Sequence, residues 1–324
     1  MSPSLEHVIL PRPGQDHGNQ RQPISGPSET VFTETFGKLL PPAKYLHTAI
    51  GKAAYYELLP TSLNNESKGP DRVLLIHGIQ TPALGMLPLA RALQNIFPQT
   101  YFVLFDLWGH GLSDTPIAPH DTTLFHQSLD DLLNQLSWPS AHLIGFSFGG
   151  STAATYLASR TSRVQSCALI APVGLFRLSD FSPEDQAQLC GDDDAAARKW
   201  VFNFFEGGDE VVPADWKQRV EKGEVVAEAV RDWQKRNHAG HEASVAAMFR
   251  DGGAMDKHAD FIRAGKTGVP SFAILGELDD VASEEQLKEH GFGNTEVVRQ
   301  AGHGLVRESV PEVAALIEGF WKGL

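Results

Sequence analysis

Short apolar runs alternate with helix-like segments along the chain, and this alternation restricts the fold more than any other feature of the sequence. The runs are RVLLI, YFVLF, HLIGF, CALIA and SFAIL (residues 72–76, 101–105, 142–146, 167–171 and 271–275). They are almost continuously apolar, which is typical of strands buried on both faces of a parallel sheet. Because helix-like segments separate them, we predict an α/β fold with a doubly wound sheet and right-handed crossovers.

Further strand-like runs lie at the two ends of this series. KYLHTAI (44–50) and AAYYELLP (53–60) are separated by a Gly-Lys pair, which predicts two strands joined by a tight turn. TEVVRQAG (295–302) predicts the last strand, and VPEVAALIEGFWKGL (310–324) predicts a closing amphipathic helix. The expected sheet is therefore mostly parallel and flanked by helices.

These patterns divide the chain into four segments. Residues 1–30 are rich in Pro, Gly, Gln and Ser, and we expect a flexible or loosely docked N-terminal arm there. Residues 31–173 and 269–324 form the two parts of the predicted α/β core. Between them, 174–268 has helical pieces rich in Trp and Phe, and we predict an inserted helical cap because a bare loop of this length is uncommon.

The charge and cysteine content argue against several function classes. The chain of 324 residues carries 40 acidic and 27 basic side chains, and its net charge of −13 disfavours binding to nucleic acid or an anionic membrane. Its two cysteines, Cys167 and Cys190, lack the spacing of a zinc site or a disulfide framework. No apolar stretch approaches the ~20 residues that cross a bilayer, and no secretory signal is evident. We therefore expect a cytoplasmic protein without metal or organic cofactor; its oligomeric state stays open.

The motif G-F-S-F-G, residues 145–149, presents a candidate nucleophile. It lies between a strand-like run and a helix-like run, where a sharp turn forces Ser147 into a strained conformation and requires small neighbours. The partial positive charge at the start of the helix favours a developing anion. The alternative is a glycine-rich turn that contains an incidental serine.

A serine hydroxyl needs a base to accept its proton, and the sequence offers 13 histidines. His303 follows the last predicted strand, at the sheet edge where Ser147 is expected, and we predict it as the base. His77 and His110 are rivals, although hydrogen bonds that stabilise their turns are the simpler interpretation of both.

The carboxylate that orients the histidine is expected after the strand SFAILG. We favour Asp279, with Asp280 as the second choice. The acidic residues there also fit a plainer role, ahead of a helix capped by Ser283 with Gln286. Asp106 is a weaker competitor, because its glycine-rich turn needs an Asp to bond its amides.

An oxyanion formed at the attacked carbonyl requires two backbone donors. The amide of Phe148 directly follows the nucleophile, and the loop after LLIHG offers the amide of Ile79, with that of Gln80 as the alternative. For substrate contacts we name Gln80, Phe146 and the cap residue Trp200.

Taken together, these motifs resemble those of capped serine hydrolases in the α/β-hydrolase superfamily, over about residues 40–324. The matching motifs, in the family's order and approximate spacing, are HG (77–78), DLWGHGLSD (106–114), GFSFG (145–149), GELD (276–279) and AGH (301–303). The resemblance implies Ser147 as nucleophile, Asp279 as acid and His303 as base. A serine at 147 is unlike the aspartate nucleophile of the family's epoxide hydrolases and haloalkane dehalogenases.

The resulting hypothesis is hydrolysis of a carboxylic ester or lactone of a small, fairly apolar molecule through an acyl-enzyme. One alternative is a hydrolase of C–C bonds in a β-diketone-like substrate, because similar capped members use the same triad for that reaction. An alternative from another class is a ligand-binding receptor with slow turnover.

Overall fold

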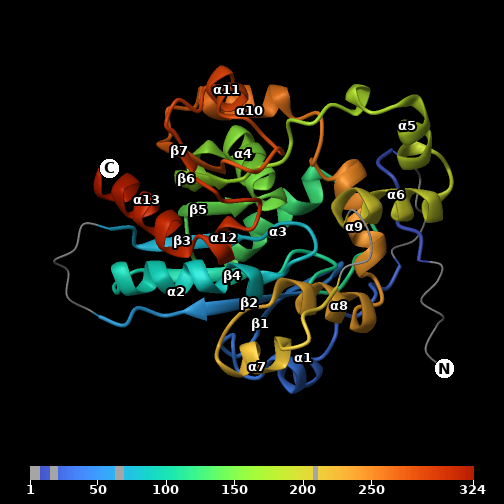
Figure 1. Ribbon diagram of the computed structural model, residues 1–324, viewed down its shortest axis with the longest axis horizontal. Coiled ribbons are helices and arrows are strands. Elements are labelled where there is room, and N and C mark those ends of the chain that lie inside the picture. The colour runs from blue at the N-terminus through green and yellow to red at the C-terminus, as the bar shows by residue number, and fades with distance from the viewer. Residues whose placement is uncertain (1–7, 15–20, 63–68, 207–210) are drawn as a thin grey trace.

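One mixed sheet forms the centre of the molecule (Figure 1). The computed structural model describes residues 8–14, 21–62, 69–206 and 211–324. Within these residues the sheet has eight strands, in the order β1 (Lys44–Thr48), β2 (Gly51–Leu58), β4 (Tyr101–Phe105), β3 (Arg72–Ile76), β5 (Ala141–Phe146), β6 (Val164–Ile170), β7 (Ser271–Gly276) and β8 (Thr295–Val298). β2 pairs antiparallel with β1 and β4, and the other neighbouring strands are parallel. The predicted mostly parallel sheet is confirmed.

Helices cover both faces of the sheet. In β3, Leu74 and Ile76 face the layer that contains α3 (Thr122–Gln135), α4 (Phe148–Ser159) and α10 (His258–Gly265). Val73 and Leu75 face the layer that contains α2 (Leu87–Ile96) and α13 (Val310–Lys322). Because side chains alternate along a strand, both faces need apolar residues, which explains the continuous apolar runs.

The connections out of β3 and β4 run in opposite directions. The chain passes from β3 through α2 to β4 on one side, and then through α3 to β5 on the other side of β3. A crevice at the carboxyl ends of the strands is expected where the strand order reverses in this way. The loop after β3 and the turn after β5 meet at this point.

The region between β6 and β7 contributes no strand to the sheet within the described residues. Its helices are η4 (Leu178–Asp180), α5 (Pro183–Cys190), α6 (Asp194–Glu206), α7 (Trp216–Glu221), α8 (Ala227–Asn237), α9 (His241–Asp251) and α10. In Figure 1, α5, α6, α8 and α9 lie beside the sheet, whereas α10 packs on α4 and buries Phe261 there. The last helix of the predicted cap segment therefore contacts the layer that covers the sheet. None of the described helices is both long and apolar enough to span a membrane.

The predicted N-terminal arm is described for residues 8–14 and from 21 onward; residues 1–7 and 15–20 lie outside the described residues. Ile24 and Thr115 exchange two backbone hydrogen bonds of 2.9 and 2.8 Å. Leu10 is buried against α9. These contacts join the arm to the turn after β4 and to the helical insertion.

A helix that the sequence analysis did not predict, α1 (Glu29–Phe36), begins at the end of this arm. The Ser28 hydroxyl accepts a hydrogen bond from the Val31 amide, as expected of a helix N-cap. Phe32 and Phe36 are buried, and both rings contact the indole of Trp233 in α8. Because the apolar stripe is only two side chains long, periodicity gave little signal for this helix.

Four buried histidines, His77, His110, His238 and His241, form a cluster between the sheet and the insertion. The ring centroids are 5.2 Å apart for His77 and His110, 4.7 Å for His110 and His241, and 6.1 Å for His241 and His238. Each ring donates a hydrogen bond to a backbone carbonyl, those of Gly78, Trp108, Ser113 and Gly109 respectively. The histidine cluster thus links the insertion helices to the loops that follow β3 and β4.

Burial lowers the pKa of these rings, because an imidazolium loses its hydration inside the protein. The pKa falls to about 4 for His77 and His238 and to about 3 for His241, and it lies well below its usual value for His110, where His241 and His77 add repulsion. All four are therefore neutral at pH 7. Asp106 has the opposite effect on how stability depends on pH, because burial raises the pKa of its carboxyl to about 6.

We predict that the free energy of unfolding decreases steeply as the pH falls from about 6.5 towards 4. In that window the unfolded chain binds protons on these histidines and the folded chain does not, at about 1.4 kcal/mol per histidine per pH unit. Below pH 6, Asp106 cancels the contribution of about one histidine to this loss of stability, because its carboxyl binds a proton at a higher pH in the folded chain than in the unfolded chain. Urea unfolding at several pH values measures the effect.

His241→Asn is expected to reduce the pH slope by about one proton, whereas His47→Gln, at an exposed position, is expected to leave it unchanged. A pH-independent free energy of unfolding between pH 7 and 5 would contradict the assignment of neutral buried rings.

Candidate active site

The turn between β5 and α4 holds Ser147 in a backbone conformation that few side chains adopt. Its φ is 54° and its ψ is −116°, and its amide donates a 2.9 Å hydrogen bond to the Ile170 carbonyl of β6. A residue with positive φ other than glycine carries strain of the order of 1–3 kcal/mol, which neighbouring contacts must offset. Such strain at the carboxyl end of a central strand is a feature of functional sites.

Three glycines allow the backbone to approach closely around this turn. A Cβ atom on Gly145 would lie 2.2 Å from the Gly149 carbonyl oxygen, and one on Gly149 would lie 2.1 Å from that of Ile76. On Gly78 it would lie 2.8 Å from Ser147 Cβ. The spacing G-x-S-x-G is therefore a packing requirement of the turn, as the sequence analysis expected.

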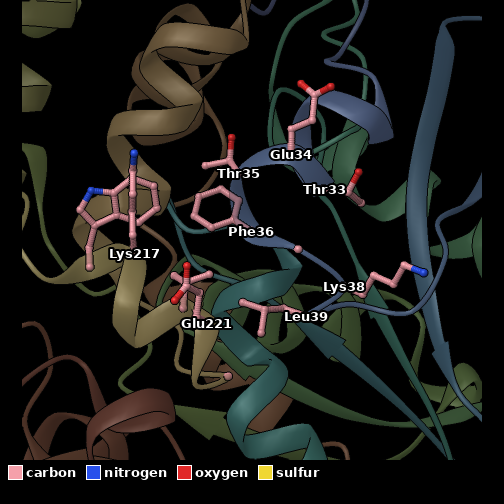
Figure 2. A pocket seen from close by; sticks show the side chains of 12 residues that line it. Thr33, Glu34, Thr35, Phe36, Lys38, Leu39, Lys217 and Glu221 are labelled. Carbon is pink, nitrogen blue, oxygen red and sulfur yellow. The ribbon is translucent and has the colours of Figure 1, made fainter.

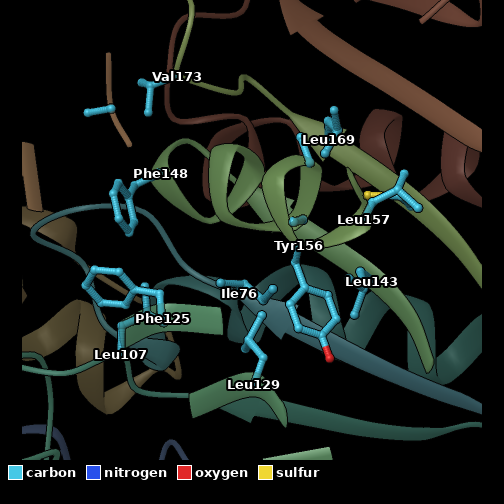
Figure 3. Packing of buried hydrophobic residues seen from close by; sticks show 14 of the residues in the cluster. Ile76, Leu107, Phe125, Leu129, Leu143, Phe148, Tyr156, Leu157, Leu169 and Val173 are labelled. Atoms are coloured by element: carbon cyan, nitrogen blue, oxygen red, sulfur yellow. The ribbon is translucent and has the colours of Figure 1, made fainter. Parts of the chain in front are cut away.

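The two phenylalanines that flank Ser147 have different environments. The Phe148 ring is fully buried and packs edge-on against Phe125, with the ring centroids 5.2 Å apart (Figure 3). The Phe146 ring lies beside the imidazole of His303, with the centroids 5.1 Å apart, and lines a cavity. Of the two rings, only that of Phe146 is placed to contact a ligand.

Ser147, His303 and Asp279 are joined by hydrogen bonds although they lie far apart in the sequence. Ser147 Oγ is 2.9 Å from His303 Nε2, and His303 Nδ1 is 2.9 Å from Asp279 Oδ2. The side chain of Asp279 is only 3% exposed, and its other oxygen accepts a bond from the Val281 amide. With Nδ1 donating to Asp279, Nε2 is free to accept the serine proton.

The rival acids take other positions. Asp280 is exposed, and the carboxylate that pairs with His303 is that of Asp279. Asp106 is buried and accepts bonds from the Leu112 and Ala83 amides and from the Tyr56 hydroxyl. Asp106 therefore stabilises its glycine-rich turn.

The segment after β7 contains both the helix cap and the carboxylate that pairs with His303. Ser283 and Gln286 form the expected capping box at the start of α11 (Glu284–Glu289). This cap leaves Asp279, four residues earlier, available to pair with His303. The rival histidines belong to the histidine cluster: the Leu107 amide donates to His77, and the Gln80 amide donates to His110.

The loop after β3 favours Ile79 as the second oxyanion donor. The Gln80 amide already donates to His110 Nε2 at 3.2 Å, and its carbonyl accepts a bond from the Gln234 side chain. No described residue accepts a hydrogen bond from the amide of Ile79 or from that of Phe148. Ile79 borders the same cavity as Ser147, so these two N–H groups are available to an oxyanion.

A cavity of about 310 Å³ opens beside Ser147. Its lining comprises Ile79, Gln80, Thr81, Phe146, Ser147, Phe205, Arg231, His303, Gly304, Arg307 and Glu308. Gln80 and Phe146 are thus where the sequence analysis expected them. Trp200 is not: its indole N–H donates to Asp185 and its ring stacks on Phe204, so Phe205 is the aromatic residue that α6 contributes.

Sequence reasoning missed Arg231 and Arg307, which bring positive charge to this cavity. Arg231 lies on α8, and Arg307 lies on α12 (Leu305–Glu308), four residues after His303. Its closeness in sequence to His303 was the available signal. In a chain of net charge −13, individual arginines gave no other cue.

A larger hollow, of about 700 Å³, lies elsewhere, between α1 and α7 (Figure 2). Acidic and basic side chains, among them Glu34, Lys38, Lys217 and Glu221, border it together with Phe36 and Trp216. Its described lining residues include no serine, cysteine or histidine. We therefore assign the chemistry to the smaller cavity. Among the described residues, no three His, Cys, Asp or Glu side chains are grouped to hold a metal ion.

Comparison with known proteins agrees with this architecture. The family model described as alpha/beta hydrolase fold matches residues 71–305, which include the loop after β3, the serine turn and His303. No curated protein sequence matches the chain.

Solved structures of several hydrolases are similar in fold. An enol-lactonase from Burkholderia xenovorans is 17% identical with a TM-score of 0.62, covering 86% of this chain and 100% of its own. A carboxylesterase from Bacillus subtilis is 20% identical with a TM-score of 0.62, covering 91% and 97%. A meta-cleavage product hydrolase from Pseudomonas fluorescens is 17% identical with a TM-score of 0.60, covering 88% and 98%. At these identities the likeness concerns the fold alone.

We predict that Gly149→Ala strongly destabilises the protein. The added methyl group would meet the backbone oxygens of Ile76 and His77 at 2.1 and 2.6 Å, so the turn has to open. A loss of about 3 kcal/mol or more in the free energy of unfolding is expected. Urea unfolding measures it.

The matched control is Gly319→Ala in α13, where the added methyl group meets no atom within 4 Å. This substitution is expected to stabilise the helix by about 0.5–1 kcal/mol. Equal effects of the two substitutions would refute the packing role of Gly149.

Proposed function

Because the chain belongs to the α/β-hydrolase family, we propose that it is a serine hydrolase that cleaves a carboxylic ester or lactone of a small molecule. One observation carries the proposal: unbroken hydrogen bonds run from Asp279 through His303 to Ser147, whose hydroxyl borders a cavity. A hydroxyl, a base and a carboxylate in this order form the arrangement that activates serine for acyl transfer.

In the acylation step, Ser147 Oγ attacks the substrate carbonyl carbon while His303 Nε2 accepts the hydroxyl proton. The carbonyl oxygen becomes an oxyanion, to which the amides of Phe148 and Ile79 donate hydrogen bonds. Asp279 holds the imidazole ring in the required tautomer and stabilises its charged form. Collapse of the intermediate breaks the bond to the leaving group, which takes the proton from His303.

Deacylation reverses these roles with water as the nucleophile. His303 accepts a proton from water, the hydroxide attacks the acyl carbon, and the acid product leaves as Ser147 regains its proton. Each proton that His303 accepts is returned in the following step, so no redox partner is required.

The character of the cavity bears on the choice of substrate. Ile79, Phe146 and Phe205 provide apolar surface, whereas Arg231, Arg307 and Glu308 are charged. We therefore infer a substrate that has both an apolar and a polar part, whereas the sequence analysis expected a fairly apolar molecule. The names of the similar structures, an enol-lactonase and a carboxylesterase, support cleavage of a C–O bond.

We predict that a fluorophosphonate probe labels Ser147. Labelling is expected to be absent in Ser147→Ala and strongly reduced in His303→Ala, because the hydroxyl then has no base. Mass spectrometry of the labelled peptide identifies the residue. Labelling at another serine, or none, would refute the mechanism.

A second prediction compares neighbouring carboxylates. Asp279→Asn is expected to lower kcat for p-nitrophenyl esters by a factor of the order of 10³–10⁴, because the imidazole loses its orienting partner. Asp280→Asn, one residue further, is expected to stay within about threefold of the unmodified enzyme, because that side chain is exposed.

The assay also includes a vinylogous diketone, the substrate type of C–C bond hydrolases. Turnover of the diketone without turnover of any ester would replace ester cleavage by C–C cleavage through the same triad. Tight ligand binding that survives Ser147→Ala, with negligible turnover of either class, would indicate a receptor.

A further inference from the structure

We propose that Arg307 forms a subsite for a carboxylate carried by the substrate, so that this hydrolase acts on monoanionic esters or lactones. The inference rests on the proposed function and names its substrate class. It starts from Arg307, which lines the Ser147 cavity and whose Nη1 atom has no acceptor in the part of the chain that the structure describes.

Packing contacts hold the Arg307 side chain beside the cavity. Its guanidinium carbon lies 5.6 Å from the centre of the Phe146 ring, a cation–π contact. Its Nη1 atom is buried and has no hydrogen-bond partner among the described residues. A methyl group placed on Gly85 would lie 3.6 Å from Nη1, so the group also packs against η2 (Ala83–Met86). A charged guanidinium without a paired acceptor is costly to bury, and an anion bound in the cavity beside it would offset that cost.

The Phe146 ring connects this guanidinium to the reacting atoms. His303 packs on the same ring, with the centroids 5.1 Å apart, and Ser147 is the next residue in the chain. A ligand that spans the ring therefore meets Ser147 Oγ with its carbonyl group and Arg307 with its other end. The 310 Å³ of the cavity limits this ligand to a small molecule.

The charges around the cavity favour a monoanion. Burial, and after it the nearby charge of Arg231, lower the pKa of Arg307 to about 10, while Glu308 and Glu228 act in the opposite direction. Arg307 therefore stays protonated at neutral pH. Glu308 also lines the cavity, so a second negative charge on the ligand would be repelled there. The planar guanidinium also matches the geometry of a carboxylate.

The test compares esters that differ in one charge. In one pair the group that differs is on the acyl side: p-nitrophenyl hemiadipate carries a terminal carboxylate, and its terminal amide is neutral. The other pair is p-carboxyphenyl acetate and p-carbamoylphenyl acetate, which place it on the leaving group. In at least one pair, kcat/KM is expected to be about 10–100 times higher for the anion, as for a charge-assisted hydrogen bond.

Arg307→Met, which keeps most of the stem over Phe146, is expected to reduce this ratio of anionic to neutral substrate by at least about tenfold. Arg307→Lys is expected to restore part of it, because the positive charge returns without the planar fork. The matched control is Arg236→Gln on the same helix as Arg231, at a side chain that is 74% exposed; the ratio is expected to stay unchanged.

Binding to the Ser147→Ala variant separates this inference from the proposed function. Monomethyl adipate is expected to raise its Tm, the neutral methyl adipamate is not, and the difference is expected to vanish in Ser147→Ala/Arg307→Met. Binding of the monoanion without turnover of any ester would overturn only the proposed function. Ester turnover with a ratio near one in both pairs, or a ratio that Arg307→Met leaves unchanged, would overturn the carboxylate subsite.

Discussion

The close approach of three backbone segments around Ser147 is the constraint on which the site depends. The end of β3, the end of β5 and the start of α4 are so near that a single added carbon at Gly145 or Gly149 would overlap a carbonyl oxygen. This contact holds Ser147 at a φ of 54°, which turns its hydroxyl out of the sheet and towards His303. Without it the strand would run into the helix through a relaxed turn, and the hydroxyl would not be held towards the imidazole.

The parallel sheet supplies the remaining groups by the same geometry. Parallel strands end at one edge, so the loops after β3, β5, β7 and β8 meet there and bring together Ile79, Ser147, Asp279 and His303. Each of these residues follows a different strand. Once the strands are in register the residues meet at the same edge of the sheet, however far apart they lie in the sequence. A rigid sheet with these loops can therefore position a nucleophile, a base and an acid within hydrogen-bonding distance.

Histidines have two separate uses in this molecule. His303 is partly exposed and borders the cavity, where a change of protonation state is useful. The histidine cluster is buried, and its members serve as neutral donors to loop carbonyls between the sheet and the insertion. Burial, which keeps the cluster neutral at pH 7, also makes its members poor candidates for proton transfer near neutral pH. Neither the residue type nor a position after a strand distinguishes the two uses, because His77 also follows a strand, whereas exposure does.

The sequence by itself determined the mostly parallel sheet and the order Ser147, Asp279, His303, because both depend on local patterns: continuous apolar runs, a glycine-spaced turn and polar residues directly after strands. It did not determine helix α1, which is stabilised by contacts of Phe32 and Phe36 with Trp233 about 200 residues away. Nor did it show that Trp200 packs away from the cavity while Arg231 and Arg307 line it. Only the tertiary structure decided these points, because the composition of a cavity is set by which faces of separate helices meet, and a periodic pattern within one helix carries no information about its partner.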